Sequence, residues 1–185
     1  MSGQDIRSLC RLFATVVDYP GSTLRQSASD CARLLEQIQP SASESMRDFV
    51  ELSGRLSPGE MEELYAQTFD ITPETTLYLG YYLFGETAKR SSFMVRLQEA
   101  YKSCDFSSPG ELTDHLSVLL RFLSVTTDAE FARTLIDECM LSSLQQVEKP
   151  LQKNKNGYAP AIAATRLFLQ QASRTMMKTG GLQHA

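Results

Sequence analysis

The sequence predicts an all-α protein, a single helical domain of roughly eight or nine helices. Apolar residues recur at intervals of three and four along most of the chain, which is the period of one face of a helix. Several segments begin with a helix-capping pattern. No segment shows sustained alternation of Val, Ile and Thr between glycine turns, so no β-sheet is expected.

The N-terminal part of the chain shows this periodicity clearly. A first helix is expected over Ile6–Val17, and the turn at Tyr19–Gly21 ends it. A second helix is expected from about Thr23 to Ile38, and Pro40 stops it. The residues expected to face the core are Ile6, Leu9, Cys10, Phe13, Val16 and Val17 in the first helix and Leu24, Ala28, Cys31, Leu34, Leu35 and Ile38 in the second.

Four later helix starts carry a capping box, a Ser or Thr followed three residues later by Glu. In this arrangement the hydroxyl and the carboxylate each accept a hydrogen bond from an otherwise unpaired backbone N–H group. Pro58 and Pro109 directly follow two of the capping serines, at the position where a missing N–H costs nothing. The pairs are Ser41/Glu44, Ser57/Glu60, Ser108/Glu111 and Thr127/Glu130.

The remaining helices are predicted from the same signals. Two polar segments are not expected to be helical. Lys149–Gly157 is expected to be a mobile loop, and residues 179–185 a disordered tail after a domain of residues 1–178. The further helices are expected over about Pro58–Phe69, Thr75–Phe84, Thr87–Cys104, Glu111–Val125, Asp128–Gln146 and Pro160–Lys178.

The composition is typical of a globular protein without a membrane segment. Hydrophobic residues make up 42% of the chain, but no run approaches the roughly 18 apolar residues of a membrane helix, so direct membrane insertion is not expected. The first residues lack the basic and apolar stretches of a signal peptide, which favours a cytoplasmic location. A net charge of −4 without a basic stripe argues against nucleic acid as a partner and is better matched to a basic peptide.

Residues that could carry chemistry are sparse. The four cysteines lie far apart, and the histidines are His115 and His184, so neither a metal site nor another cofactor is expected. His115 follows Asp114 directly, but neighbours on a helix point about 100° apart, so a catalytic pair is not expected. The chain has no glycine-rich phosphate loop. These residues indicate a binding protein rather than an enzyme.

One segment, Glu63–Gly85, is the strongest candidate for a binding surface. It holds Tyr65, Tyr78, Tyr81 and Tyr82, four of the seven tyrosines. Tyrosine combines a large apolar ring with a polar tip, which suits contact with another chain. The last three are three and four residues apart and are therefore expected on one helix face. Plain core packing with the hydroxyl at the rim is the alternative for these tyrosines.

Two segments together resemble a known family. They are Glu63–Gly85 and Glu111–Leu123, and the second reads Glu-Leu-Thr-Asp-His-Leu-Ser-Val-Leu-Leu-Arg-Phe-Leu. They are similar to the assembly chaperones of molybdenum oxidoreductases, specifically the NarJ-type branch (nitrate reductase delta subunits) of the TorD/DmsD/NarJ group. That branch has a Glu-x-Phe-Asp-like turn before a Ser/Thr-Leu-x-Leu helix, and later a Glu-Leu-Pro-Asp-His-Leu-Pro-x-x-Leu-Glu-Phe segment. Through Arg11–Phe13, Asp18–Pro20 and Gly157–Pro160 the resemblance extends from about residue 8 to residue 170.

The chain departs from the family pattern at three positions. Thr113 and Ser117 stand where the family usually has proline, and Arg121 stands where it often has glutamate. Thr113 can still cap a helix that Asp114 begins, whereas Arg121 changes the local charge. These departures leave the client enzyme open.

The resemblance implies a TorD-like helical fold and a function without catalysis. Such a chaperone binds the N-terminal segment of the apo catalytic subunit of a molybdoenzyme, often a twin-arginine leader or its remnant. Respiratory nitrate reductase is the implied client. The chaperone holds the apoprotein competent for insertion of the molybdenum cofactor and delays membrane attachment or export. Molybdenum cofactor biosynthesis proteins are further implied partners.

The resemblance and the residue chemistry together indicate a peptide-binding site. A leader folded as an amphipathic helix would lay its apolar face in a groove and its arginines against carboxylates. The structural alternatives are a helix-start acid for Asp114 and a hydrogen-bonded helix residue for His115. The residues expected at the site are Tyr65, Phe69, Asp70, Tyr78, Tyr81, Tyr82, Glu111, Asp114, His115 and Leu119.

Two other functions stay open at this point. A chaperone for another molybdenum oxidoreductase, of the DMSO-reductase-like class, would share all of these features. A generic scaffold that binds partner helices would need only the helical periodicity. The sequence also does not decide between a monomer and a helix-swapped dimer hinged at Lys149–Gly157.

Overall fold

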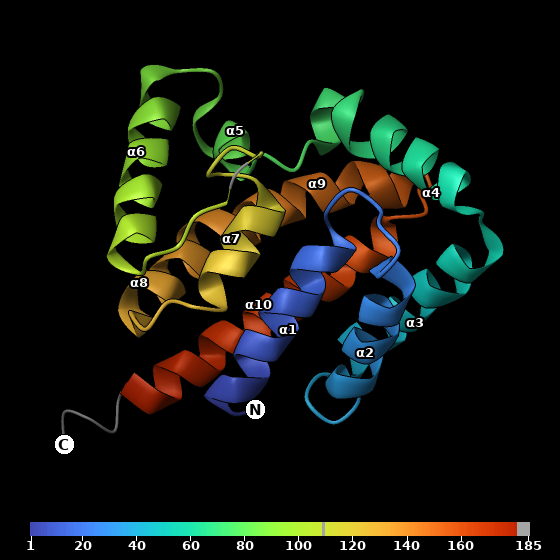
Figure 1. Cartoon of the computed structure of the whole chain (residues 1–185), viewed down its shortest axis with the longest axis horizontal. Helices are drawn as coiled ribbons and strands as arrows, with labels where there is room; N and C mark the ends of the chain where they lie inside the picture. The colour runs from blue at the N-terminus through green and yellow to red at the C-terminus, as the bar shows by residue number, and fades with distance from the viewer. Residues whose placement is uncertain (109, 181–185) are drawn as a thin grey trace.

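The computed structural model describes the backbone of residues 1–108 and 110–180, and the side chains as far as Met177. Over these residues the chain is helical without strands, which confirms the all-α prediction (Figure 1). The α-helices are α1 Gly3–Val16, α2 Leu24–Leu35, α3 Pro40–Arg55, α4 Pro58–Tyr65, α5 Leu79–Phe84, α6 Ala88–Ser103, α7 Leu116–Leu123, α8 Ala129–Thr134, α9 Leu141–Lys153 and α10 Ala159–Gly180.

Three short segments of other helical types complete the chain. The π-helical segment η1, Ala66–Asp70, extends α4, and η2, Pro73–Thr75, is a single 3-10 turn. The π-helical segment η3, Leu135–Met140, joins α8 to α9 without a break. Counting α8, η3 and α9 as one, the described residues form nine separate helices besides the 3-10 turn, in line with the predicted eight or nine.

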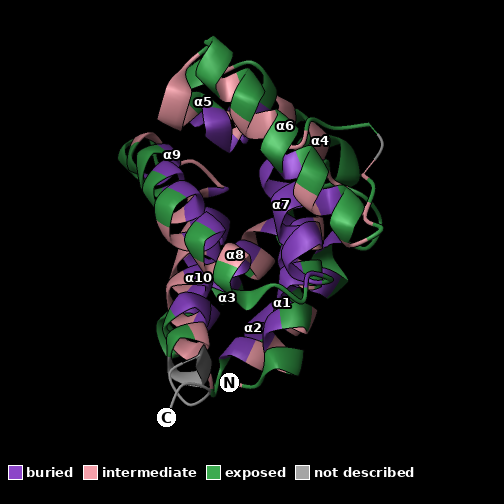
Figure 2. Ribbon diagram, turned by 90° about the vertical axis from the view of Figure 1, so that its left-hand side faces the viewer, coloured by how far each residue is buried: buried purple, intermediate pink, exposed green. Residues whose placement is uncertain are grey.

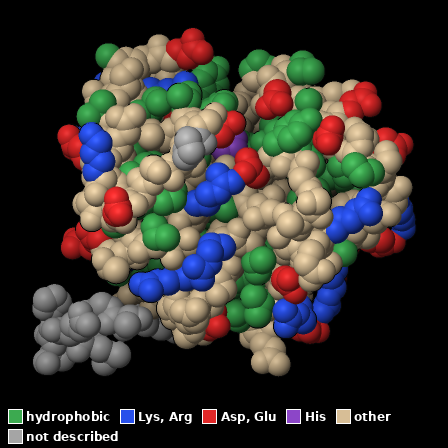
Figure 3. Space-filling view, in the orientation of Figure 1, with side chains coloured by type: hydrophobic (Ala, Val, Ile, Leu, Met, Phe, Trp, Pro, Cys, Tyr) green, Lys and Arg blue, Asp and Glu red, His purple; other side chains and the backbone are tan. Residues whose placement is uncertain are grey.

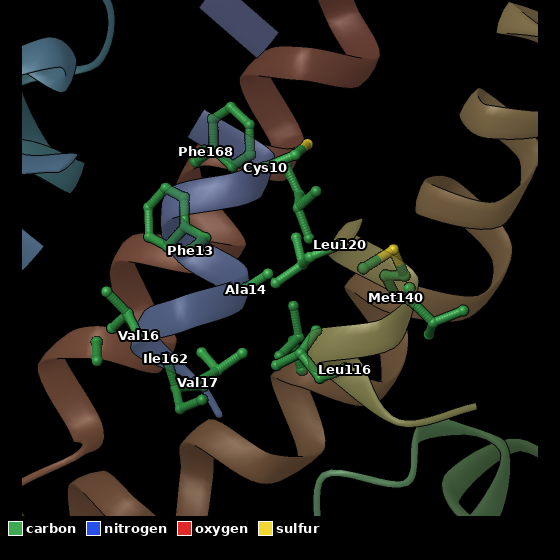
Figure 4. Packing of buried hydrophobic residues seen from close by; sticks show 14 of the residues in the cluster. Cys10, Phe13, Ala14, Val16, Val17, Leu116, Leu120, Met140, Ile162 and Phe168 are labelled. Carbon is green, nitrogen blue, oxygen red and sulfur yellow. The ribbon is translucent and has the colours of Figure 1, made fainter. Parts of the chain in front are cut away.

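Helix α1 lies at the centre of the molecule and packs against α2, α7 and α10 (Figures 1 and 4). The residues predicted to form its apolar face are all at most 5% exposed. Phe13 stacks on Phe168 of α10 with ring centroids 5.0 Å apart. Burying one such side chain contributes roughly 1.5–3 kcal/mol. The periodicity of the N-terminal segment therefore located the core correctly.

Helix α2 packs on α3, and α3 packs on α10. Leu24, Ala28, Cys31 and Leu35 are buried as predicted. The helix ends at Leu35 rather than at residue 38, and the predicted core residues 34 and 38 are only partly buried against the core. Figure 2 shows the buried side of each helix turned toward its neighbours, with the exposed residues on the outer surface.

Only one of the four predicted capping boxes forms. Ser57 and Glu60 cap α4 reciprocally. Helix α3 begins one residue before Ser41, because Pro40 occupies its first turn. Helix α8 is capped by Asp128, whose carboxylate accepts the Phe131 N–H at 2.9 Å, not by Thr127. The Ser108/Glu111 prediction is also wrong, since no helix starts there among the described residues and α7 begins only at residue 116. A capping box that was not predicted, Ser2 with Asp5, starts α1.

The predicted loop Lys149–Gly157 is wrong in its first half, because α9 continues through Pro150 to Lys153, whereas residues 154–158 form a non-helical connection to α10. A proline inside a helix removes one backbone hydrogen bond, and packing against α10 offsets this loss. Leu151 is 2% exposed, and Glu148 pairs with Arg166 of α10. The boundary expected at residue 178 falls within α10, which is helical to residue 180; the rest of the expected tail, residues 181–185, lies outside the described residues.

Candidate peptide-binding site

The two segments that resemble the chaperone family meet in space. The backbone N–H of Leu79 donates to the Asp114 carbonyl at 2.9 Å, and the N–H of Leu116 donates to the Leu77 carbonyl at 2.9 Å. These two bonds form an isolated antiparallel bridge between Tyr78 and His115. Each strand-like segment leads directly into a helix, α5 or α7. The bridge therefore sets the entry points of both helices.

The Asp114 carboxylate lies at the centre of this junction and is already paired. Its side chain is 0% exposed, and Arg90 of α6 donates to it from Nε at 2.8 Å and from Nη2 at 3.3 Å. Hydrogen bonding to Asp114 raises the pKa of Arg90 above its ordinary value. The expectation that Asp114 begins a helix and takes a partner's arginine is therefore corrected. In the free chain its counter-ion is internal.

Gly80, the second residue of α5, makes room for this ion pair. A Cβ atom at this position would lie 2.6 Å from Oδ2 of Asp114, 3.3 Å from the Phe93 ring and 3.4 Å from the Arg90 side chain. No real Cβ contact is as short as the first of these. A glycine inside a predicted helix is a signal of close approach, and here the approaching group is a buried carboxylate.

His115 caps α7. Its ring is 4% exposed, and Nδ1 accepts the Ser117 N–H at 3.3 Å and lies 2.9 Å from the Ser117 hydroxyl. Desolvation by burial lowers the pKa of His115, which fits a neutral ring that accepts at Nδ1. Among the hydrogen bonds of the described residues, none joins the His115 ring to the Asp114 carboxylate.

Tyr78 connects the junction to the surface. Its hydroxyl donates to Glu111 at 2.8 Å, its ring packs edge-on to His115 with centroids 5.1 Å apart, and the Arg90 guanidinium lies 5.8 Å from its ring centre. Desolvation and the Glu111 hydrogen bond raise the pKa of Tyr78 to about 12. Tyr78 precedes α5 in extended backbone. The expectation that it shares a helix face with Tyr81 and Tyr82 is therefore wrong.

Three of the predicted site residues lie in the core. Tyr65, Phe69 and Leu119 are 4%, 3% and 0% exposed. Tyr65 and Phe69 pack edge-to-face, with centroids 5.1 Å apart, and both contact the ring of Tyr158. Tyr65 therefore belongs to the core packing that was the alternative for the tyrosines, and Leu119 is also a core residue. One edge of Phe69 reaches a surface cavity.

That cavity is the accessible part of the site. It has a volume of about 410 Å³. Asp70 and Tyr81, two of the residues expected at the site, line it, and both are exposed. Desolvation and the nearby Glu111 raise the pKa of Asp70. The complete lining is Phe69, Asp70, Pro73, Thr76, Tyr78, Tyr81, Glu86 and Arg90.

Figure 3 shows a hollow at the same junction, between the α5–α6 part and the α4 part of the molecule. The described histidine lies at its bottom, with acidic side chains beside it. Arg121, which departs from the family pattern, pairs with Asp18 near this hollow. The charge that Arg121 introduces is therefore matched within the chain.

The sequence did not identify Gly80, Glu86 and Arg90 as site residues. Gly80 carried a signal that was available, a glycine within a predicted helix. Arg90 lies 24 residues from Asp114 along the chain, and nothing in their spacing connects them. Among the described residues no group of three or more His, Cys, Asp or Glu side chains could hold a metal ion.

The fold and this junction define a class of protein. The structure is similar to that of a candidate redox enzyme maturation protein from Archaeoglobus fulgidus, with a TM-score of 0.59 over 89% of this chain and 93% of that chain at 21% identity. This similarity concerns the fold and confirms the expected helical architecture. The sequence matches the nitrate reductase delta subunit family over residues 33–173. The chain belongs to that family, as the two motifs predicted.

Two curated relatives are similar over a shorter range. The nitrate reductase-like protein NarX of Mycobacterium tuberculosis, in the strains CDC 1551 / Oshkosh and ATCC 25618 / H37Rv, is 32% identical over 124 residues. The match covers 66% of this chain but only 18% of the relatives. This chain thus corresponds to about a fifth of their length. In the described part of this chain, no helix has the length and hydrophobicity to span a membrane.

Proposed function

We propose that the protein is a maturation chaperone that binds a segment of the catalytic subunit of a redox enzyme before its molybdenum cofactor is inserted. Membership of the nitrate reductase delta subunit family supports this proposal, as do the names of the relatives and of the structural neighbour. The observation that carries it is the cavity beside Tyr81. Aromatic and acidic side chains are exposed there, and the acids make no ion pair with another described residue.

Charge argues for the kind of segment that binds. Asp70 and Glu86 line the cavity, are exposed, and make no ion pair with any other described residue. The cation at the cavity wall, Arg90, is neutralised by Asp114. The cavity is therefore net acidic and suits a segment with basic side chains beside apolar ones. The N-terminal segment of the client, a twin-arginine leader or its remnant, has this chemistry.

The finer assignments follow from the same proposal. Respiratory nitrate reductase is the client, and the apoprotein stays competent for cofactor insertion while membrane attachment or export is delayed. The chaperone itself catalyses no reaction and is located in the cytoplasm. Proteins of molybdenum cofactor biosynthesis are further partners. A DMSO-reductase-like client would use the same cavity, so the test includes both.

The test is isothermal titration of the full chain with two synthetic peptides. One copies roughly the first 25–30 residues of a respiratory nitrate reductase catalytic subunit, and the other the same region of a DMSO-reductase-like enzyme. A Kd near 1 μM, or about −8 kcal/mol, for either peptide supports the chaperone and names its client. In parallel, the tagged chain is recovered from cells that make both enzymes without the cofactor. If neither peptide binds and neither apo subunit is recovered, the proposal is wrong and a generic scaffold remains.

A further inference from the structure

A second cavity adjoins the candidate site at Tyr81. Its volume is about 610 Å³. Pro73 and Tyr81 line both this cavity and the first one, so the two cavities meet at these residues. The complete lining of the second cavity is Pro73, Glu74, Tyr81, Tyr82, Gln146, Lys149 and Pro150.

We propose that the two cavities form one groove that binds a single client segment. The segment has basic side chains toward Asp70 and Glu86, an apolar side chain against Tyr81, and a non-basic end beside Lys149. This inference rests on the proposed function and extends its site from the Tyr78–His115 junction to α9, which no sequence motif indicated. We call this surface the Tyr81 groove; it consists of the residues that line the two cavities.

The floor of the Tyr81 groove is fixed before any partner binds. The Tyr82 hydroxyl donates to the backbone carbonyls of Glu74 at 3.1 Å and Thr76 at 2.9 Å, which holds its ring in place. The Tyr81 ring packs edge-to-face on Tyr82 with centroids 5.9 Å apart and stays 36% exposed. A preformed aromatic surface reduces the ordering cost of binding, because the rings lose little further freedom.

Helix α9 supplies the opposite wall together with a backbone acceptor. Figure 2 shows α5 above α9, and the two helices are in contact. Pro150 has no N–H group, so the carbonyl of Gln146, four residues earlier, lacks its usual helical donor. Both residues line the second cavity. In the proposed groove this carbonyl accepts an N–H group of the bound segment.

The charges along the Tyr81 groove give the segment a polarity. Asp70 and Glu86 lie in the first cavity, and Glu74 and Lys149 lie in the second. All four are exposed, and none makes an ion pair with another described residue. Three unpaired carboxylates against one ammonium favour a basic segment, and Lys149 repels a basic residue from the far end.

The test measures peptide affinity in groove variants and matched controls, using the peptide that wild type binds. Tyr81→Ala is expected to weaken binding at least about fivefold, as central aromatic contacts do. Its control, Tyr19→Ala, removes a tyrosine that is 55% exposed and lines neither cavity. Lys149→Glu is expected to tighten binding by up to about fivefold. Its control is Lys153→Glu, on the same helix outside the groove.

A third variant separates a binding role from a structural one. Pro150→Ala restores a donor to the Gln146 carbonyl, so it is expected to stabilise the fold while weakening peptide binding. If wild type binds and the groove variants bind like their controls, the Tyr81 groove is wrong while the chaperone function stands. If wild type binds neither peptide and recovers no apo subunit, the function and the groove are both wrong.

Discussion

Replacing Arg90 with methionine tests whether the buried ion pair holds the candidate site together. The substitution keeps much of the aliphatic volume but leaves the Asp114 carboxylate, 0% exposed, without its two donors at 2.8 and 3.3 Å. Breaking a buried ion pair by removing one partner costs about 3–5 kcal/mol. For a chain of this size that loss corresponds to a fall in melting temperature of roughly 6–20 °C.

The assay is urea unfolding followed by circular dichroism, together with thermal melting. Arg90→Met/Asp114→Asn removes the uncompensated charge, so it should be more stable than Arg90→Met alone. Arg33→Met is the control, because Arg33 pairs with Asp30 on the surface with a side chain 70% exposed, and its loss should hardly change the midpoint. If Arg90→Met unfolds at the same urea concentration as the Arg33 variant, the pair does not stabilise the junction and the reasoning fails.

Three further predictions follow from the same site. Gly80→Ala should destabilise the fold, because the clash of its Cβ with Asp114 costs about 1–3 kcal/mol, more than the roughly 0.5–1 kcal/mol that alanine gains over glycine in a helix. Urea unfolding measures the sign of the change in stability, and a stabilised variant would contradict the prediction. Leu119→Ala should lower the free energy of unfolding by about 2–5 kcal/mol, as core truncations do, yet its folded molecules should bind the peptide with wild-type affinity in calorimetry. A large loss of affinity in fully folded protein would show that Leu119 contributes to the site. Folding lowers the pKa of His115 from 6.5, so the unfolded chain binds more protons below pH 6.5 and the protein should lose stability as the pH falls toward the folded pKa. The unfolding free energy, measured from pH 7.5 to 5.5, should therefore fall more steeply with decreasing pH in wild type than in His115→Asn. Equal slopes would refute this.

The helices that could be predicted are those whose signals are local. The apolar period of α1 located residues that are now buried against α2, α7 and α10. Such a period is set by residues within two helical turns of one another, and any apolar surface can bury the face that it creates. Pro150 shows the limit of local signals. It reads as a helix end, yet α9 continues because the contacts of Glu148 and Leu151 outweigh one lost hydrogen bond.

The segments that form the site could be predicted from the sequence, but the contacts between their side chains could not. The segments around Tyr78 and His115 were both identified, and the structure joins them. The capping prediction at Glu111 failed because α7 begins only at Leu116, and the Glu111 carboxylate instead accepts the Tyr78 hydroxyl. This bond links residues 33 positions apart, and sequence spacing within one element says nothing about it.

The burial of Asp114 and His115 changes how binding data from this site must be interpreted. Asp114 anchors α6 through Arg90, and His115 caps α7, so both hold the elements around the site in place. Exposed residues that line the first cavity, among them Asp70, Tyr81 and Glu86, are the ones proposed to contact a partner. An Asp114→Ala variant will therefore lose peptide binding together with stability, whereas Asp70→Asn will lose binding at unchanged stability. Affinity scaled to the folded fraction, measured for both variants, distinguishes a residue that builds the site from one that contacts the client.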